Sequence, residues 1–265
     1  HFDGALRAGL EACGPKLRRA WLLRQQVPGA RASDVAVLLE CAAHFGLEAG
    51  FAQVALDYLT DRADEVDEAG AISGVFAMCL TGGIATHSQL LLLLFRKIGA
   101  GTAWERRRRE TFQLWVCQLL QFPWLDARLP RRCVTAGLRD WVLHRRGYGC
   151  PFPDEASEVA ADLAAMGVQH RKFVAVPDTP YEVDVAVGRR KDALLVVSEL
   201  SRNTLQPIGG MLLQLRHLRA LGWRCVLVPR GVWLGLRGGP AELRQRYLRS
   251  LLAGFGYEGS RAEKK

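Results

Sequence analysis

The first half of the chain repeats its apolar positions with the period of an α-helix. Segments 51–63 and 88–98 place apolar residues three or four apart, which predicts amphipathic helices. Shorter stretches rich in small residues come before them, at 37–47 and 75–84, and a third follows at 114–122. We therefore expect helix pairs, in which a small-residue helix, a turn near Gly46 or Gly83 and an apolar helix follow one another.

An internal period accompanies these pairs. Cys41, Cys79 and Cys117 are each 38 residues apart, and apolar neighbours keep the same register. One helix pair cannot bury its apolar face alone and would stack on the next, so the period favours an α-solenoid-like repeat. An irregular helical bundle, in which the three cysteines align by chance, is the alternative. In either case the cysteines are expected to be small core residues.

The uncharged stretch Ala69–Phe95 is long enough to cross a bilayer. Its middle, TGGIATHSQ, interrupts the apolar residues with glycines and polar side chains, and Leu90–Phe95 is the one solid apolar run in it. Two packed helices with a turn between them explain the stretch better than a membrane span.

The pattern changes after YGCPFPDEAS (148–157), where prolines and glycine predict a boundary. A short helix is expected over 157–167, with Ser157 as its N-cap and Gly167 at its end. The remaining expected elements are strands at 173–176, 181–187 and 193–200, a helix at 207–221, a strand at 224–229 and a helix at 242–252. The order αβββαβα predicts helices packed around a small sheet.

Composition narrows the class of protein without defining its function. In 265 residues, 49% are apolar and 24% charged, which excludes a disordered chain, a collagen-like fibre and a small disulfide scaffold. Seven dispersed cysteines without a C-x-x-C pair favour reduced, buried thiols over a zinc site. The 36 lysines and arginines exceed the 27 acids and leave a net charge of +9, which suggests an anionic partner such as nucleic acid.

Basic clusters are candidate RNA contacts, because arginine forks suit phosphate and stack on bases. In the first half they are interleaved with Trp104, Trp115, Trp124 and Trp141. A solvated charged face and core tryptophans are the alternative. The candidates are Arg106, Arg107, Arg108, Arg109, Arg131, Arg132, Arg145, Arg146, Lys172, Arg189, Arg190, Lys191, Arg202 and Arg230. Residues 189–191 lie in an expected β-turn and should be exposed.

The second half resembles the RAP domain. The resemblance rests on YEVDVAV, ALLVVSEL and the ending LRALGWRCVLVPRGVW, together with the spaced pattern of Ser157–Gly167, and it covers about residues 155–255. Proteins of this family, among them octotricopeptide and FAST kinase-like groups, commonly place helical repeats before the domain and act on organellar RNA. Several are ribosomal subunits. The resemblance thus implies an α-helical repeat region (1–147), a linker (148–156), a RAP-like α/β domain (157–255) and a polar tail (256–265).

The RAP domain is similar to a minimal PD-(D/E)xK endonuclease fold, so cleavage must be considered. That chemistry uses two carboxylates on adjacent strands to hold Mg²⁺ and a nearby lysine. Asp184 occupies the first position, whereas the next strand offers Glu199, with Ser201 at the lysine position. If Val197 is taken as the second position instead, the carboxylate is missing and Glu199 falls at the aspartate of the family's E-x-D pattern. The catalytic set therefore looks incomplete, and Asp184 and Glu199 are vestigial candidates.

These observations lead to one expectation. The chain is a two-part α+β protein that binds RNA without catalysis, as a component of a mitochondrial ribosome contacting rRNA and ribosomal proteins in the matrix. The expectation includes no cofactor, metal, membrane or small-molecule substrate. The alternatives are an organellar RNA-processing endonuclease or RNA-stability factor, a plastid location, and a protein-binding scaffold without RNA contact.

Overall fold

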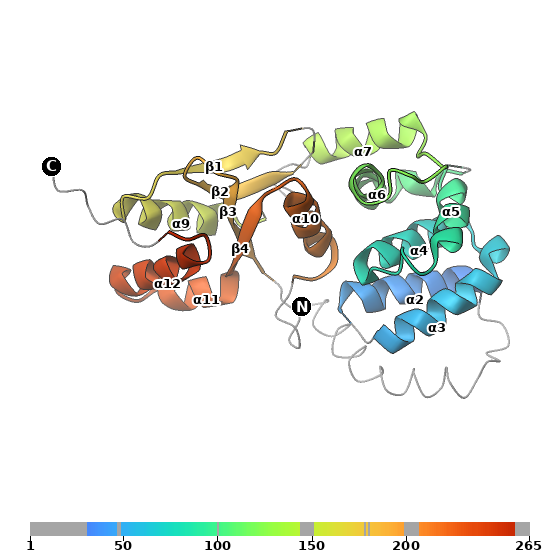
Figure 1. Cartoon of the computed structure of the whole chain (residues 1–265), viewed down its shortest axis with the longest axis horizontal. Coiled ribbons are helices and arrows are strands. Elements are labelled where there is room, and N and C mark those ends of the chain that lie inside the picture. Colours follow the sequence, from blue (N-terminus) through green and yellow to red (C-terminus); the bar gives the residue numbers. More distant parts are fainter. Residues whose placement is uncertain are drawn as a thin grey trace. The chain divides into compact units, whose positions relative to one another are not determined.

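The computed structural model describes residues 31–46, 49–99, 101–143, 151–177, 179, 181–198 and 207–257. It divides into two compact units (Figure 1). The first runs to Asp140 and includes Ile208–Leu213, and the second comprises Trp141–Pro207 and Gln214–Lys265. The mixed α/β class, with a helical N-terminal part, is confirmed.

Helix pairs in chain order build the first unit. The pairs are α2 (Ala32–His44) with α3 (Ala49–Asp61), α4 (Glu68–Thr81) with α5 (Ser88–Lys97), and α6 (Arg108–Leu120) followed by α7 (Arg131–Leu143). Short 3₁₀ helices η1 (Ala63–Glu65) and η2 (Ala103–Glu105) lie between pairs.

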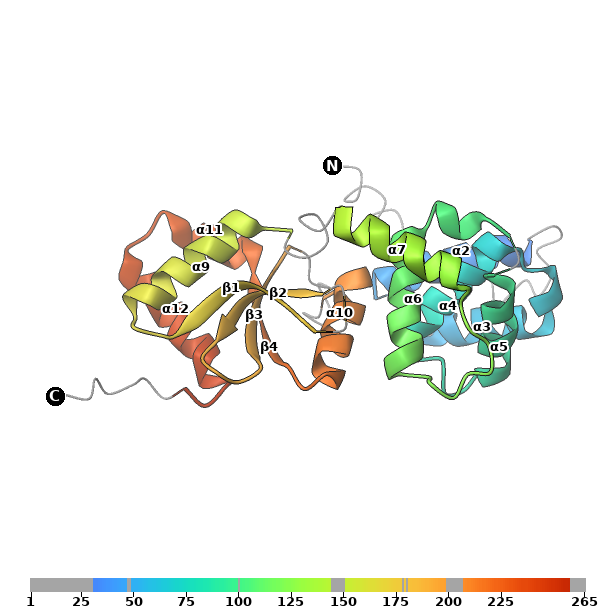
Figure 2. The same ribbon diagram turned by 90° about the horizontal axis from the view of Figure 1, so that it is seen from above.

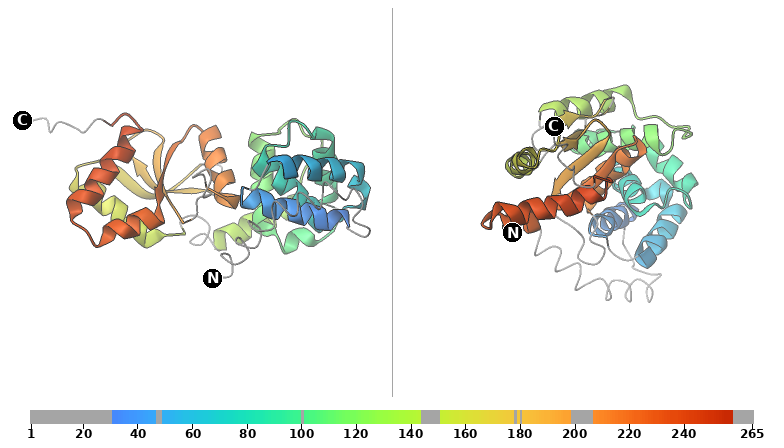
Figure 3. Two further views of the ribbon diagram at one scale, coloured as in Figure 1. Left: turned by 90° about the horizontal axis from the view of Figure 1, so that it is seen from below. Right: turned by 60° about the vertical axis from the view of Figure 1, so that its left-hand side comes forward.

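The first helices of successive pairs pack side by side. Helix α4 contacts both α2 and α6, and α3 contacts α5, so each pair stacks on its neighbour (Figure 3). Cys41, Cys79 and Cys117 lie on these first helices; Cys79 and Cys117 are buried and Cys41 is half-buried. This arrangement agrees with the helix-pair period of the sequence.

The uncharged stretch forms α4 and α5, which are joined by a turn. Gly82 ends α4 with a left-handed φ of 79°, a conformation that glycine adopts without the strain of a side chain. Among the helices that the structure describes, none is long and apolar enough to cross a membrane.

In the second unit, the described strands β1 (His170–Ala175), β2 (Glu182–Val187), β3 (Asp192–Val197) and β4 (Arg224–Pro229) form one sheet in the order β1-β2-β3-β4. The first three strands are antiparallel, and β4 runs parallel to β3. The parallel pair is joined through α10 (Gly209–Ala220), since parallel strands need a long connection.

Helices cover both faces of this sheet (Figure 2). Helices α9 (Pro153–Ala165), α11 (Arg230–Arg237) and α12 (Ala241–Ala253) lie over one face, and α10 over the other. Buried Val185, Val187, Leu194 and Val196 alternate along β2 and β3 and pack with Trp233 toward α9. This cluster is the core of the second unit.

Two details of the expected element order were wrong. Helix α9 begins at Pro153 inside the expected linker, so Ser157 lies within the helix and is not its N-cap. Proline at the first position and the acids Asp154 and Glu155 in the first turn start the helix there. Helix α11 was not expected, because two glycines, Gly231 and Gly235, obscure its apolar pattern.

Candidate nucleic-acid interface

The candidate cations of the helical unit have unequal surroundings. Arg106, Arg131 and Arg132 are exposed, whereas Arg108 and Arg109 are half-buried at the start of α6. Arg107 is held inside the unit: one guanidinium nitrogen donates to Glu40 on α2 and the other donates to Ser73 Oγ on α4 at 2.6 Å. Arg107, at the N-cap of α6, therefore ties the first helices of the three pairs together and is not available to a phosphate.

Arginines of the second unit make ion pairs with helix α9. Arg230 Nε donates to Glu155 Oε1 at 2.8 Å, Arg237 pairs with Glu158 at 2.9 Å, and Arg244 Nε donates to Asp162 at 2.7 Å. The acids lie three and four residues apart, so one face of α9 presents them to α11 and α12. Arg230, expected to contact RNA, is thus a partner of a buried carboxylate.

Another set of cations remains exposed. Arg189, Arg190 and Lys191 lie in the turn between β2 and β3, as expected, and all three are exposed. Lys172 is exposed on β1, next to Arg171, which the sequence analysis did not single out. Within the described residues, none of these five forms an ion pair with an acid. Arg145, Arg146 and Arg202 lie outside the described residues.

Asp184 has a well-defined environment. Its side chain is 2% exposed, and its Oδ2 accepts a hydrogen bond from the backbone N–H of Val196 on β3 at 2.7 Å. Glu199 and Ser201 lie outside the described residues. Within the described part of the chain, no group of three or more acids, histidines or cysteines is arranged to hold a metal ion.

Buried titratable groups lie on the same face of the sheet as Asp184. His217 on α10 is fully buried, and its Nδ1 lies 2.7 Å from the hydroxyl of Tyr181. Burial, with a smaller contribution from Arg216, lowers the pKa of His217 to about 4. Burial also raises the pKa of Cys225 to about 12. A neutral imidazole and a protonated thiol are suited to a packed interior.

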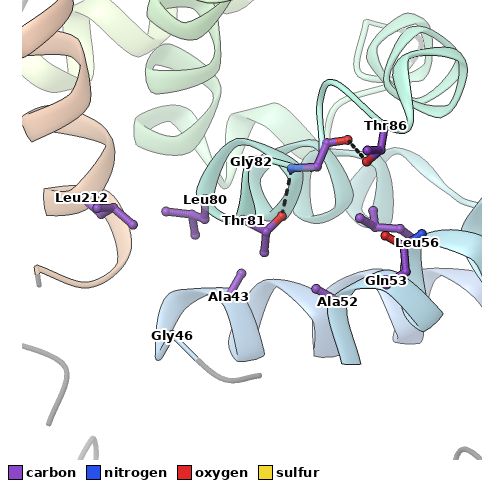
Figure 4. Close-up of a pocket in the computed structure, with 11 residues that line it drawn as sticks. Ala43, Gly46, Ala52, Gln53, Leu56, Leu80, Thr81, Gly82, Thr86 and Leu212 are labelled. Atoms are coloured by element: carbon purple, nitrogen blue, oxygen red, sulfur yellow. Dashed lines mark hydrogen bonds between the residues drawn. The ribbon is translucent and has the colours of Figure 1, made fainter. Parts of the chain in front are cut away.

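The helical unit contains a cavity of about 370 Å³ between α2, α3 and the turn after α4 (Figure 4). Ala43, Ala52, Gln53, Leu56 and Thr81 are among the residues that line it, and its lining carries no charged side chain. Beside it, His87 lies 3.1 Å from Asp57 and 2.8 Å from Thr86 Oγ1, which connects α3 to the start of α5. An uncharged cavity of this kind does not suit phosphate.

Comparisons with known proteins add no family assignment. No model of a known protein family matches the chain, and no curated protein matches it with significant similarity.

Proposed function

We propose that the protein is a non-catalytic RNA-binding protein of an organelle, and that it serves as a structural component of a mitochondrial ribosome in contact with rRNA and ribosomal proteins. The observation that carries the proposal is the separation of its cations. Arg107, Arg230, Arg237 and Arg244 are used in internal ion pairs, whereas other cations remain exposed without a described acidic partner.

The exposed cations support RNA because their charge is not neutralised within the unit. A phosphate backbone releases counterions when lysines and arginines bind it, and this release supplies most of the non-specific affinity. The RAP-like sequence features support the organellar part of the proposal, and the stacked helix pairs are compatible with the repeats that precede such domains.

Sedimentation of the native protein from organellar lysate tests the ribosomal assignment. We expect the protein to travel with a ribosomal subunit in a sucrose gradient and to shift to lighter fractions after RNase treatment. A protein that stays light with and without RNase would contradict a ribosomal role.

The non-catalytic assignment has its own test. The hydrogen bond from Val196 to Asp184 gives this carboxylate a structural task between β2 and β3. We expect the full chain to leave a labelled RNA intact in Mg²⁺. Mg²⁺-dependent cleavage that disappears in Asp184→Asn, while the variant remains folded by circular dichroism, would establish the endonuclease alternative instead.

A further inference from the structure

One end of the sheet in the second unit gathers cations from three segments: β1, the β2–β3 turn and the end of α10. The strand register places His170, Val187, Asp192 and Arg224 at the same level across β1 to β4. The exposed cations at or within two residues of this level, together with the one in the last turn of α10, define what we call the basic end: Arg171, Lys172, Arg189, Arg190, Lys191 and Arg219.

Contacts fix the segments of the basic end to each other. Lys191 Nζ donates to the carbonyl of Leu221 at 2.9 Å, which joins the β2–β3 turn to the end of α10. Arg219, in the last turn of α10, is close enough to Cys225 on β4 for its charge to lower the pKa of that thiol in part. Gly188 begins the turn with a φ of 62°, and a Cβ there would lie 2.1 Å from the hydroxyl oxygen of Tyr257.

The basic end has no available negative charge of its own among the described residues. Asp192 is the acid that the register brings to this level, and it is fully buried. Arg224 neutralises it through two hydrogen bonds, from Nε at 2.6 Å and from Nη2 at 2.7 Å. Among the residues that the structure describes, no acid therefore compensates the six cations of the basic end.

The residue types of the basic end also indicate whether it binds the bases or the phosphates of an RNA. Of the described aromatic residues nearby, Trp223 and Phe255 are buried and Phe173 and Tyr257 are half-buried, so none presents a fully exposed ring to a base. Base recognition needs such a stacking face or polar groups aimed at base edges, whereas phosphates need only positioned cations. Strands about 4.8 Å apart spread the cations of β1 and of the β2–β3 turn over roughly 10 Å, which spans more than one phosphate.

From this arrangement, and resting on the proposed RNA-binding function, we infer that the basic end is the surface through which the second unit binds the phosphate backbone of structured RNA. It recognises the shape and charge of the helix without reading its sequence. Arg171 and Arg219 belong to this surface together with the turn residues.

The experiment measures the affinity of the full-length chain for a fluorescein-labelled RNA hairpin by anisotropy, over a range of KCl concentrations. The test variant is Arg189→Gln/Arg190→Gln. The matched control is Arg246→Gln/Arg249→Gln, which removes two equally exposed arginines from α12 in the same unit. Circular dichroism confirms that both variants are folded, which is expected because all four side chains are exposed.

We expect the test variant to bind about 30-fold more weakly at 0.1 M salt and its salt slope to flatten by about 2, because each phosphate contact contributes a slope near one. The control variant should keep the affinity of the unmodified protein. A second hairpin with its stem sequence inverted should bind as tightly as the first.

Each other outcome has a defined meaning. If the unmodified protein binds RNA and both variants behave alike, or if inverting the stem sequence abolishes binding, the inference about the basic end is wrong while RNA binding stands. If the unmodified protein does not bind the hairpin, the proposed function fails together with the inference. Equal or tighter binding to vesicles containing 30% phosphatidylserine, lost in the test variant, would assign the surface to a membrane.

Discussion

Phe173 shows at the scale of one residue how packing overrides backbone preference. It has a φ of 53°, the left-handed region that is unfavourable for side chains larger than glycine, yet its ring packs against the core beneath α9. Alternation along β1 would otherwise direct this side chain to the opposite face, since Lys172 and Val174 pair with Val185 and Val183. The burial of the ring therefore offsets the strain.

Substitutions at Phe173 separate these two contributions. Phe173→Ala loses the ring and keeps the strained backbone, so we expect it to lower the free energy of unfolding by about 2 kcal/mol. Phe173→Gly loses the ring and also the strain, and should be about 1 kcal/mol more stable than the alanine variant. Urea denaturation measures both. An alanine variant more stable than the glycine variant, the usual order in strands, would contradict this account.

His217 predicts a pH dependence of stability. Its folded-state pKa is lowered from 6.5 to about 4, so the unfolded chain binds more protons between these values. The stability contribution is complete above pH 6.5 and is lost as the pH falls toward 4, by about 3 kcal/mol in total. Urea unfolding at pH 7, 5.5 and 4 measures this loss. His217→Gln should show a smaller decrease over the same window, and an equal decrease in both proteins would rule His217 out as its source.

At the scale of elements, helix α9 is held by the pairing of its acids with α11 and α12. Glu158 also accepts a hydrogen bond from Trp233 Nε1 at 2.9 Å, which anchors the buried indole. Burial disfavours the charge of Glu155, but hydrogen bonds from its backbone and from Arg230, with the charges of Arg230 and Arg237, outweigh burial and lower its pKa. The ionised Glu155 side chain therefore stabilises the fold above pH 4.5, and this stability is lost as the pH falls below that value.

Removal of the Glu155 charge tests the role of these pairs. Glu155→Gln leaves Arg230 without its carboxylate partner, and we expect the free energy of unfolding to fall by about 2 kcal/mol. Glu242→Gln, an exposed acid in the first turn of α12, is the control and should change stability by less than about 0.5 kcal/mol. Equal effects of the two substitutions would show that the buried pair contributes nothing specific.

Strand β4, at Arg224–Pro229, was predicted at its observed bounds, and β2 and α12 within a residue or two, because apolar runs and turn residues define them locally. Helix α11 could not be predicted in this way. Its short, glycine-rich sequence folds through contacts with acids about 75 residues earlier, such as Trp233 with Glu158 and Arg230 with Glu155. Because these partners lie so far apart in sequence, the pattern identified the cations but could not show which of them are paired.

At the scale of the whole molecule, the lysines and arginines that the structure describes include two groups with different roles. Arg107 and Arg230 are bound to buried or half-buried acids and stabilise their own units. The exposed cations contribute little to stability, because a surface charge without a partner is well solvated. Net charge alone therefore overstates the surface available to a polyanion.

This division predicts opposite effects in two assays. Arg107→Gln should lower the free energy of unfolding by about 2 kcal/mol and leave the affinity for an RNA hairpin within about twofold. Arg189→Gln/Arg190→Gln should do the reverse. Parallel urea denaturation and anisotropy measurements on both variants check this pattern, and an Arg107 variant that stays stable but loses RNA affinity would place that residue at the interface.

The burial of the cysteines determines how their thiols react: in the described part of the chain three are buried and two are half-buried. Burial raises the pKa values of Cys41, Cys133 and Cys225, and Cys79 and Cys117 are shielded within the stacked helix pairs. Because the thiolate is the reactive form, these sulfurs are poor targets for peroxide and alkylating agents while the fold is intact. Each becomes reactive when its own helix or strand opens, so the rate at which these five thiols are modified in the native protein reports local opening along the chain.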